Sequence, residues 1–276
     1  MASAIAFLLP RQTSRDTTAS KFYASEHQPG SWRADMSVRI VLLRSAAIMV
    51  LLFAAATRAE TLPLPPNLIS LSSDSGEEIL LESTARRSYW PLSIQFVTQK
   101  NQAYCGVATM VMVLNALSVT APPTPGIEPF KTFTQENVLN PSTERILPQD
   151  VLREKGMTLD QFAGLVGTYG VKAEVYHADT IDIDGFRTLA SQALDSRGSY
   201  VVVNYLRRTL GEESGGHISP LAAFDAKTDR FLVLDVARYK YPPVWVKTAD
   251  LYSAMNTTDS DNQGRRRGFV LVRTAP

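Results

Sequence analysis

A single cysteine, Cys105, is the feature that most constrains how this chain can fold. One thiol cannot form an intramolecular disulfide. A structural zinc site normally takes about four Cys or His ligands, and the sequence has one Cys and three His. We therefore expect no metal site, and the fold must be stabilised by an apolar core. With 276 residues, 45% of them hydrophobic, the chain is long enough for one full-sized globular domain.

The charges are balanced, with 28 Lys and Arg against 27 Asp and Glu. This balance provides no electrostatic attraction for nucleic acid or for an anionic membrane, so neither is expected as a partner. The basic run at residues 265–267 is, taken alone, more often a solvated turn than a binding patch.

Residues 36–59 have the layout of a secretory signal peptide. Arg39 and Arg44 precede an apolar run from Ser45 to Ala56, and small residues up to Ala59 offer a cleavage site. The run is shorter than the roughly 20 residues that cross a bilayer, so no stable membrane partner is expected. A buried helix and an uncleaved anchor are the alternative interpretations. The signal peptide predicts a periplasmic or secreted protein.

The stretch before it, residues 1–35, is polar and lacks periodicity. We interpret it as a non-native or disordered extension, with translation starting at Met36. Residues 60–84 are rich in Pro, Ser and Asp and are expected to be a leader and loop segment. Residues 85–276 are expected to form a single domain.

Within that domain, helix patterns come first and strand patterns later, which predicts an α+β fold. Residues 105–117 are apolar on most sides and predict a buried helix that ends before the Pro-rich loop at 121–126. Further helices are predicted at 149–155, 159–169, 185–195 and 248–255. Strands are predicted at 171–176, 200–205, 218–224, 231–236 and 269–272.

Cys105 is the candidate nucleophile. A lone cysteine in an apolar run is most often a small buried hydrophobe. Here, however, it lies at the predicted start of a helix, whose N-terminus stabilises a thiolate. Gly106 follows directly and leaves room for a substrate to approach the sulfur. An exported chain that keeps an unpaired thiol also risks its oxidation unless the thiol is used.

His217 is the candidate base. It opens a predicted strand after two glycines, and Gly216 beside it leaves space for substrate. His177 ends another strand without distinctive neighbours in the sequence. A Cys–His pair supplies an activated nucleophile, and the protonated imidazole can then donate to a leaving amine.

A third group should orient the imidazole. Asp235 follows an apolar strand, and a hairpin through residues 227–229 would return it to His217, whereas Asp225 lies just before that turn. For the oxyanion, the backbone N–H of Cys105 and a side-chain amide of Gln99 or Gln102 are the candidate donors.

The residues around this site resemble a known family, the phytochelatin synthases. The resemblance is carried by TQKNQAYCGVATMVMVLNAL at 98–117, by GHISPLAAFDAKTDRFLVLDVARYKYPPVWV at 216–246 and by RRGF at 266–269. It extends from about Tyr89 to Arg273. It implies a papain-like fold, with an N-terminal helical half and a C-terminal antiparallel sheet half.

The resemblance also implies an activity. It gives the triad Cys105, His217 and Asp235, with Gln99 as the oxyanion-hole amide. The family cleaves the Cys–Gly bond of glutathione, releases glycine and holds a γ-glutamylcysteinyl thioester. Water then yields γ-glutamylcysteine, or a second glutathione yields phytochelatin.

Further positions match the family's substrate region. Arg238, Lys240 and Tyr241 match its lining segment. Asp259 and Arg267 match charged residues that grip the γ-glutamyl amine and carboxylate, although the local loop leaves open whether Arg266 or Arg267 does so.

The pattern fits the short bacterial members, which consist of the catalytic domain and in which hydrolysis dominates. No cofactor is expected, although cadmium or zinc could arrive as a glutathione thiolate, and a homodimer is considered. The alternatives are a cysteine peptidase of the bacteriocin-processing kind and a periplasmic thiol or metal binder without turnover.

Overall fold

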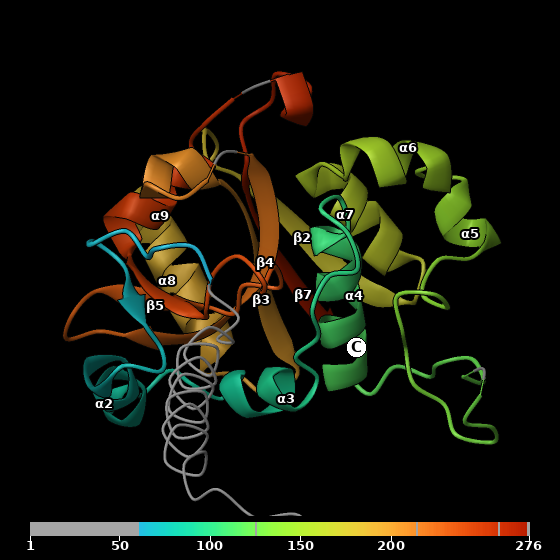
Figure 1. The fold of residues 1–276 in the computed structure, drawn as a ribbon, viewed down its shortest axis with the longest axis horizontal. Helices are drawn as coiled ribbons and strands as arrows, with labels where there is room; N and C mark the ends of the chain where they lie inside the picture. The colour runs from blue at the N-terminus through green and yellow to red at the C-terminus, as the bar shows by residue number, and fades with distance from the viewer. Residues whose placement is uncertain (1–60, 125, 214, 259, 275–276) are drawn as a thin grey trace, which may run out of the picture. The chain divides into compact units, whose positions relative to one another are not determined.

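An antiparallel sheet is the framework on which the other elements pack (Figure 1). The structure is a computed structural model that describes residues 61–124, 126–213, 215–258 and 260–274. In this part of the chain the seven-stranded sheet has the order β1-β6-β5-β4-β3-β7-β2, and neighbouring strands are antiparallel. The strands are β1 Ile69–Ser70, β2 Val171–His177, β3 Ser199–Leu206, β4 Gly216–Asp225, β5 Arg230–Val233, β6 Val244–Lys247 and β7 Gly268–Thr274.

Most helices precede the long strands, as the sequence predicts. None of those in the described residues is both long and apolar enough to cross a membrane. The helices are α2 Asp74–Glu82, α3 Tyr89–Ile94, α4 Cys105–Ala116, α5 Pro141–Glu144, α6 Gln149–Lys155, α7 Leu159–Gly167, α8 Ile183–Leu194 and α9 Thr248–Met255, with short 3-10 turns η1 Arg207–Leu210 and η2 Ser260–Asn262.

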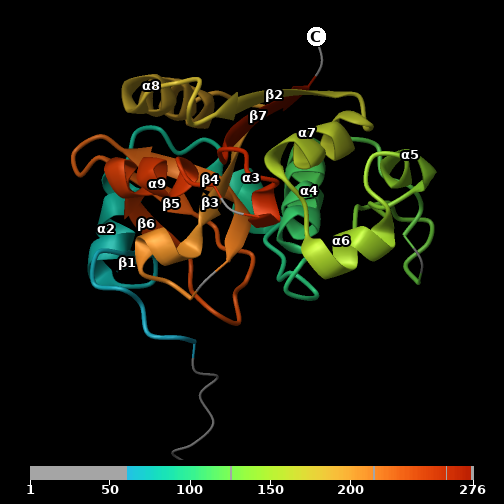
Figure 2. The same cartoon turned by 90° about the horizontal axis from the view of Figure 1, so that it is seen from above.

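Two apolar cores lie on the two faces of the sheet, and alternation along β3 separates them. Val202 faces the core that contains α4 and α7, whereas Val201 and Val203 face the core that contains α8 and α9. Both views show the sheet between these helix groups (Figures 1 and 2). Helix α4 is buried along almost its whole length, which explains its lack of a polar face. The α+β class is confirmed.

The predicted helices and strands are confirmed, with ends that differ by a few residues. The interpretation of residues 60–84 as leader and loop is wrong in part. These residues include β1, which pairs with β6, and α2, which Ser73 caps through the N–H of Gly76. The indole of Trp245 donates to Gly76 O at 3.0 Å. These contacts join the segment to the sheet from a distant part of the chain. The predicted segments 1–35 and 36–59 lie outside the described residues.

Gly268 tests how tightly the sheet is packed. It pairs with His177 in β2 and Asn204 in β3, and a Cβ there would lie 2.0 Å from Tyr176 O. Because only backbone movement can relieve that clash, we expect Gly268→Ala to lower the free energy of unfolding by about 3 kcal/mol. The measurement is urea denaturation. Gly167→Ala is the matched control, since no atom lies within 4 Å of its added Cβ, and it should stabilise α7 by about 0.5 kcal/mol. Equal effects of the two changes would contradict this packing.

Candidate active site

The thiol of Cys105 lies at the first residue of α4, where the helix meets the sheet. The N-cap residue Tyr104 makes no side-chain capping bond. The positive end of the helix dipole therefore acts on Cys105 without a competing side chain. One turn further along α4, the buried Thr109 donates from Oγ1 to Ile218 O in β4 at 3.2 Å. This contact fixes α4 against β4 and so holds Cys105 beside the neighbouring residue of that strand, His217.

His217 is oriented by two partners on one ring nitrogen. Its Nε2 lies 2.9 Å from Asp235 Oδ1 and 2.8 Å from Ser219 Oγ. The imidazole is also hydrogen-bonded to Cys105. Because Nε2 faces Asp235, Nδ1 is the nitrogen left for the thiol. The competing carboxylate, Asp225, instead accepts from the N–H and Oγ1 of Thr228 at the hairpin turn.

The charges of this pair stabilise a thiolate. Burial raises the pKa of the Cys105 thiol, but the hydrogen bond and charge of His217 and the N–H groups of Ile218 and Gly106 outweigh burial and lower it. Burial and the charge of Arg207 lower the pKa of His217, yet its contacts with Asp235 and Cys105 raise it above the ordinary value. Both shifts act in the direction that favours a thiolate–imidazolium pair over the neutral pair.

Asp235 remains ionised although it is fully buried. Burial raises its pKa, but the charges of His217 and Arg207 and the N–H of Ala237 hold it well below the usual range. Its Oδ1 accepts from Ala237 N at 2.7 Å. A buried carboxylate of this kind needs cations on both sides, because removing either leaves an uncompensated charge.

The second cation is Arg207, which the sequence analysis missed. Its guanidinium is buried, with Nη2 2.7 Å from Asp235 Oδ2 and Nη1 2.6 Å from Glu212 Oε2. Burial raises the pKa of Glu212. The guanidinium also lies over the ring of Tyr241, 5.3 Å from its centroid. The available signal was an arginine two residues after the largely apolar strand predicted at 200–205.

Two adjoining hollows open at the thiol and the imidazole. The first, of about 80 Å³, is lined by Cys105, His217 and Arg267 among others. The second, of about 340 Å³, is lined by His217, Gln99 and Lys240 among others. Gly216 lines both hollows. A Cβ on Gly216 would lie 3.0 Å from Arg267 Nη2, so the glycine lets the guanidinium approach.

The structure separates Arg266 from Arg267. Arg267 is buried at the Cys105 hollow, with Nη1 3.1 Å from Thr257 Oγ1. Arg266 instead donates to Asn256 O and lines a different hollow, next to His177. His177 takes no part in the site, since its Nδ1 lies 2.7 Å from Arg266 O and its Nε2 3.1 Å from Asp160 Oδ1.

Only some of the other predicted substrate residues lie at the two hollows. Lys240 lines the second hollow and pairs with Glu213 at 3.1 Å. Tyr241 is buried, and its hydroxyl accepts from Glu213 N. Its ring packs against the guanidinium of Arg207. Arg238 is exposed and stacks over Phe96 at 4.7 Å without lining either hollow. Asp259 lies outside the described residues.

Gln99 is positioned by the strand end that carries Asp235, because its N–H donates to Val236 O at 2.9 Å. Its side-chain Nε2 donates to Asn101 O at 2.7 Å and to Tyr239 Oη at 3.1 Å. Both amide hydrogens are thus engaged within the protein. Gln102, the other amide candidate, lines both hollows from the exposed loop before α4.

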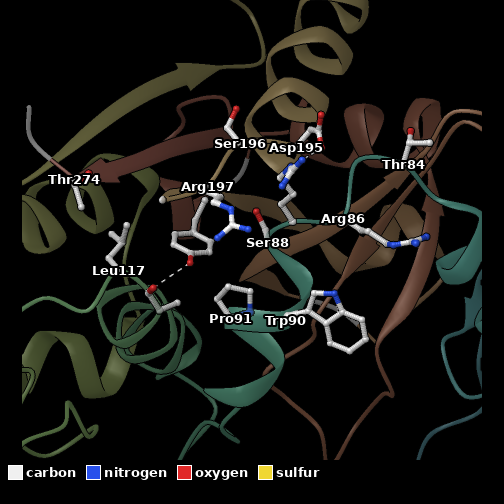
Figure 3. A pocket seen from close by; sticks show the side chains of 14 residues that line it. Thr84, Arg86, Ser88, Trp90, Pro91, Leu117, Asp195, Ser196, Arg197 and Thr274 are labelled. Atoms are coloured by element: carbon white, nitrogen blue, oxygen red, sulfur yellow. Dashed lines mark hydrogen bonds and ion pairs between the residues drawn. The ribbon is translucent and has the colours of Figure 1, made fainter.

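A hollow of about 610 Å³ elsewhere does not resemble this site (Figure 3). No Cys or His lines it. Arg87 in its wall pairs with Asp195 at 3.1 Å, and Arg86 donates to carbonyls that end α2. Arg86 and Arg87 thus both have structural partners. In the described part of the chain, no group of three or more His, Cys, Asp or Glu side chains could hold a metal ion.

A cysteine at a helix start, facing a histidine and a carboxylate on an antiparallel sheet, defines the papain-like class of cysteine enzymes. The comparison with family models agrees, since residues 59–269 match the model described as phytochelatin synthase. The chain belongs to the phytochelatin synthase family.

The curated relatives are glutathione gamma-glutamylcysteinyltransferases. The chain is 34% identical to enzyme 1 of Lotus japonicus, over 76% of this chain and 41% of that protein. It is 34% identical to enzyme 2 of Arabidopsis thaliana, over 76% of this chain and 45% of that protein. The chain thus spans less than half the length of these relatives. A solved double glycine motif protease from an AMS/PCAT transporter matches at 12% identity and a TM-score of 0.33, covering 65% of this chain and 90% of that one, which is too low to establish a shared fold.

The pairing of Cys105 with His217 predicts how the alkylation rate of the Cys105 thiol depends on pH. Cys105 is the only cysteine, so iodoacetamide reports on it alone. A lowered thiol pKa keeps the thiolate present as the pH falls below the usual value of about 8.5. We expect alkylation to stay rapid at a pH below that usual value and to be at least about tenfold slower there in His217→Gln, because burial then raises the thiol pKa. His177→Gln is the matched control and should keep the wild-type profile. An unchanged profile in His217→Gln would refute the pairing.

Proposed function

We propose that this chain is a glutathione gamma-glutamylcysteinyltransferase-like enzyme that uses Cys105 as its nucleophile. The observation that carries the proposal is the Cys105 thiol with a lowered pKa, hydrogen-bonded to His217, which Asp235 orients at 2.9 Å. The names of the curated relatives support glutathione as the substrate. The two adjoining hollows support a substrate that extends to both sides of the thiol.

The first half-reaction is acyl transfer to sulfur. The Cys105 thiolate adds to the carbonyl carbon of the Cys–Gly peptide bond and gives a tetrahedral oxyanion. When this collapses, the C–N bond breaks, and the His217 imidazolium donates its Nδ1 proton to the departing glycine amine. The products are free glycine and a γ-glutamylcysteinyl thioester on Cys105. Asp235 holds the ring in place and stabilises its charge throughout.

The tetrahedral oxyanion needs hydrogen-bond donors at the point where its negative charge develops. We propose the backbone N–H of Cys105 and the side-chain amide of Gln99. Gln99 Nε2 now donates to Tyr239 Oη, and Tyr239 is 46% exposed, so its ring is free to turn away. The arriving carbonyl oxygen would then replace the Tyr239 hydroxyl as acceptor, while the bond from Gln99 to Asn101 O keeps the amide oriented.

The second half-reaction regenerates the thiolate. Neutral His217 takes a proton from water, and attack on the thioester carbonyl gives γ-glutamylcysteine. Attack by the amine of a second glutathione gives phytochelatin instead. Within the proposal we favour hydrolysis with some transfer. Cadmium or zinc would enter as a glutathione thiolate, that is, as part of the substrate.

Glycine release from glutathione tests the proposal. We expect the wild-type chain to release glycine and Cys105→Ser to release none. His217→Asn should be at least a thousandfold slower, because it loses both the thiolate and the proton donor. Mass spectrometry of quenched protein should show a γ-glutamylcysteinyl adduct on Cys105. Product analysis with and without cadmium separates hydrolysis from transfer.

Two outcomes would contradict the proposed activity. Cleavage of a double-glycine leader peptide, with no glycine from glutathione at any pH between about 6 and 9, would identify a peptidase instead. Glutathione binding without an acyl adduct would identify a binder without turnover. His177→Gln serves as the folded control, because it changes a histidine outside the site.

We further propose that the mature protein is periplasmic or secreted. The support is the signal-peptide layout of residues 36–59. Expression of the full chain in a Gram-negative host should give a periplasmic product whose intact mass corresponds to a start near Glu60. Replacing apolar Leu51 and Leu52 by Asp should retain the protein in the cytoplasm with its N-terminus uncut. An uncut chain in the cytoplasm from the wild-type gene would contradict export.

A further inference from the structure

One cation borders every hollow around the nucleophile. Lys155, the last residue of α6, lines the hollow at Cys105 of about 80 Å³, the hollow at His217 of about 340 Å³, and a third of about 470 Å³ beside α6 and α7. The first of these is small, so Lys155 and Cys105 lie close to each other across it. A substrate bound in the Cys105 hollow would therefore lie beside Lys155.

The backbone places Lys155 there through two glycines. Gly156 ends α6 with φ of +70°, a conformation that favours glycine, and its N–H donates to Leu152 O at 3.0 Å. Met157 then packs on the start of α4, since a Cβ on Gly106 would lie 2.5 Å from its sulfur. The segment from Lys155 to Met157 is thereby fixed against the residue that follows Cys105.

The neighbouring cations already have partners. Arg207 pairs with Glu212 and Asp235, and Lys240 pairs with Glu213. Arg153 lines the His217 hollow but not the Cys105 hollow, and its Nε donates to Tyr104 Oη at 3.4 Å. Lys155, by contrast, makes no ion pair or side-chain hydrogen bond with any residue that the structure describes. An ammonium group at a substrate hollow without such a partner is suited to an anionic part of the substrate.

Glutathione carries two carboxylates, one on each side of the bond that is cut. The glycine amine must lie on the His217 side, because that imidazole protonates it. The hollow on that side is lined by Lys155 and not by Arg267, which borders only the Cys105 hollow. We propose that Lys155 binds the glycine carboxylate of the donor glutathione; this role rests on the proposed function. The contact would be lost when glycine departs.

An interaction that is present in both the bound substrate and the transition state changes KM rather than kcat. We therefore expect Lys155→Met to raise the KM for glutathione about fivefold, as for a solvent-accessible ion pair, with kcat nearly unchanged. The second substrate is glutathione whose glycine carboxylate is replaced by a carboxamide. Wild-type protein should discriminate against it about fivefold, and Lys155→Met should treat the two substrates alike.

Matched variants separate charge from structure. Lys155→Arg keeps a cation and should restore most of the discrimination. Lys131→Met removes an exposed lysine of the loop between α4 and α5 and should behave as wild type. Equal losses of Lys155→Met on both substrates, or no loss on glutathione, would overturn the role of Lys155 while leaving glycine release intact. Absence of glycine release from the wild-type chain would overturn the proposed function and this role together.

Discussion

The ion pair between buried Asp235 and His217 is the contact on which the rest of the site depends. Two charges can stay in an apolar interior only if each is compensated. Asp235 therefore pairs with Arg207 as well as His217, and the guanidinium of Arg207 also pairs with Glu212. This chain of alternating charges is shielded from water, so its electrostatic effects remain strong. Asp235 raises the pKa of the imidazole against the opposing effects of burial and Arg207, and the charged imidazole in turn lowers the pKa of the Cys105 thiol.

The sheet converts distant parts of the sequence into one site. Strand β4 carries His217, and the hairpin to β5 returns the chain so that Asp235 lies beside it. Helix α4 is fixed on the same strand by the bond from Thr109 to Ile218. The base and its carboxylate thus share one rigid framework, and the nucleophile comes from a separate layer packed on it. Substrate hollows open where those layers meet.

Much of this arrangement could be predicted from the sequence because it follows local rules. A helix that starts at Cys105, a strand that opens with His217 and a hairpin to Asp235 all have short-range signals. Arg207 and Glu212 do not, since their meaning comes from long-range burial. For the same reason the sequence did not separate Arg266 from Arg267, nor place Ile69–Ser70 on the sheet. The hydrogen bonds of the Gln99 amide likewise depend on side-chain packing.

A site divided between two layers also has a consequence for the life of a newly made chain. Before α4 docks on β4, Cys105 is an ordinary thiol, mostly protonated at neutral pH and poorly reactive. Its reactivity develops only when the imidazole and the N–H of Ile218 arrive. The same assembly buries the sulfur. Folding itself therefore activates the nucleophile, and an immature chain is spared the oxidation and stray acylation that an already activated thiol would suffer.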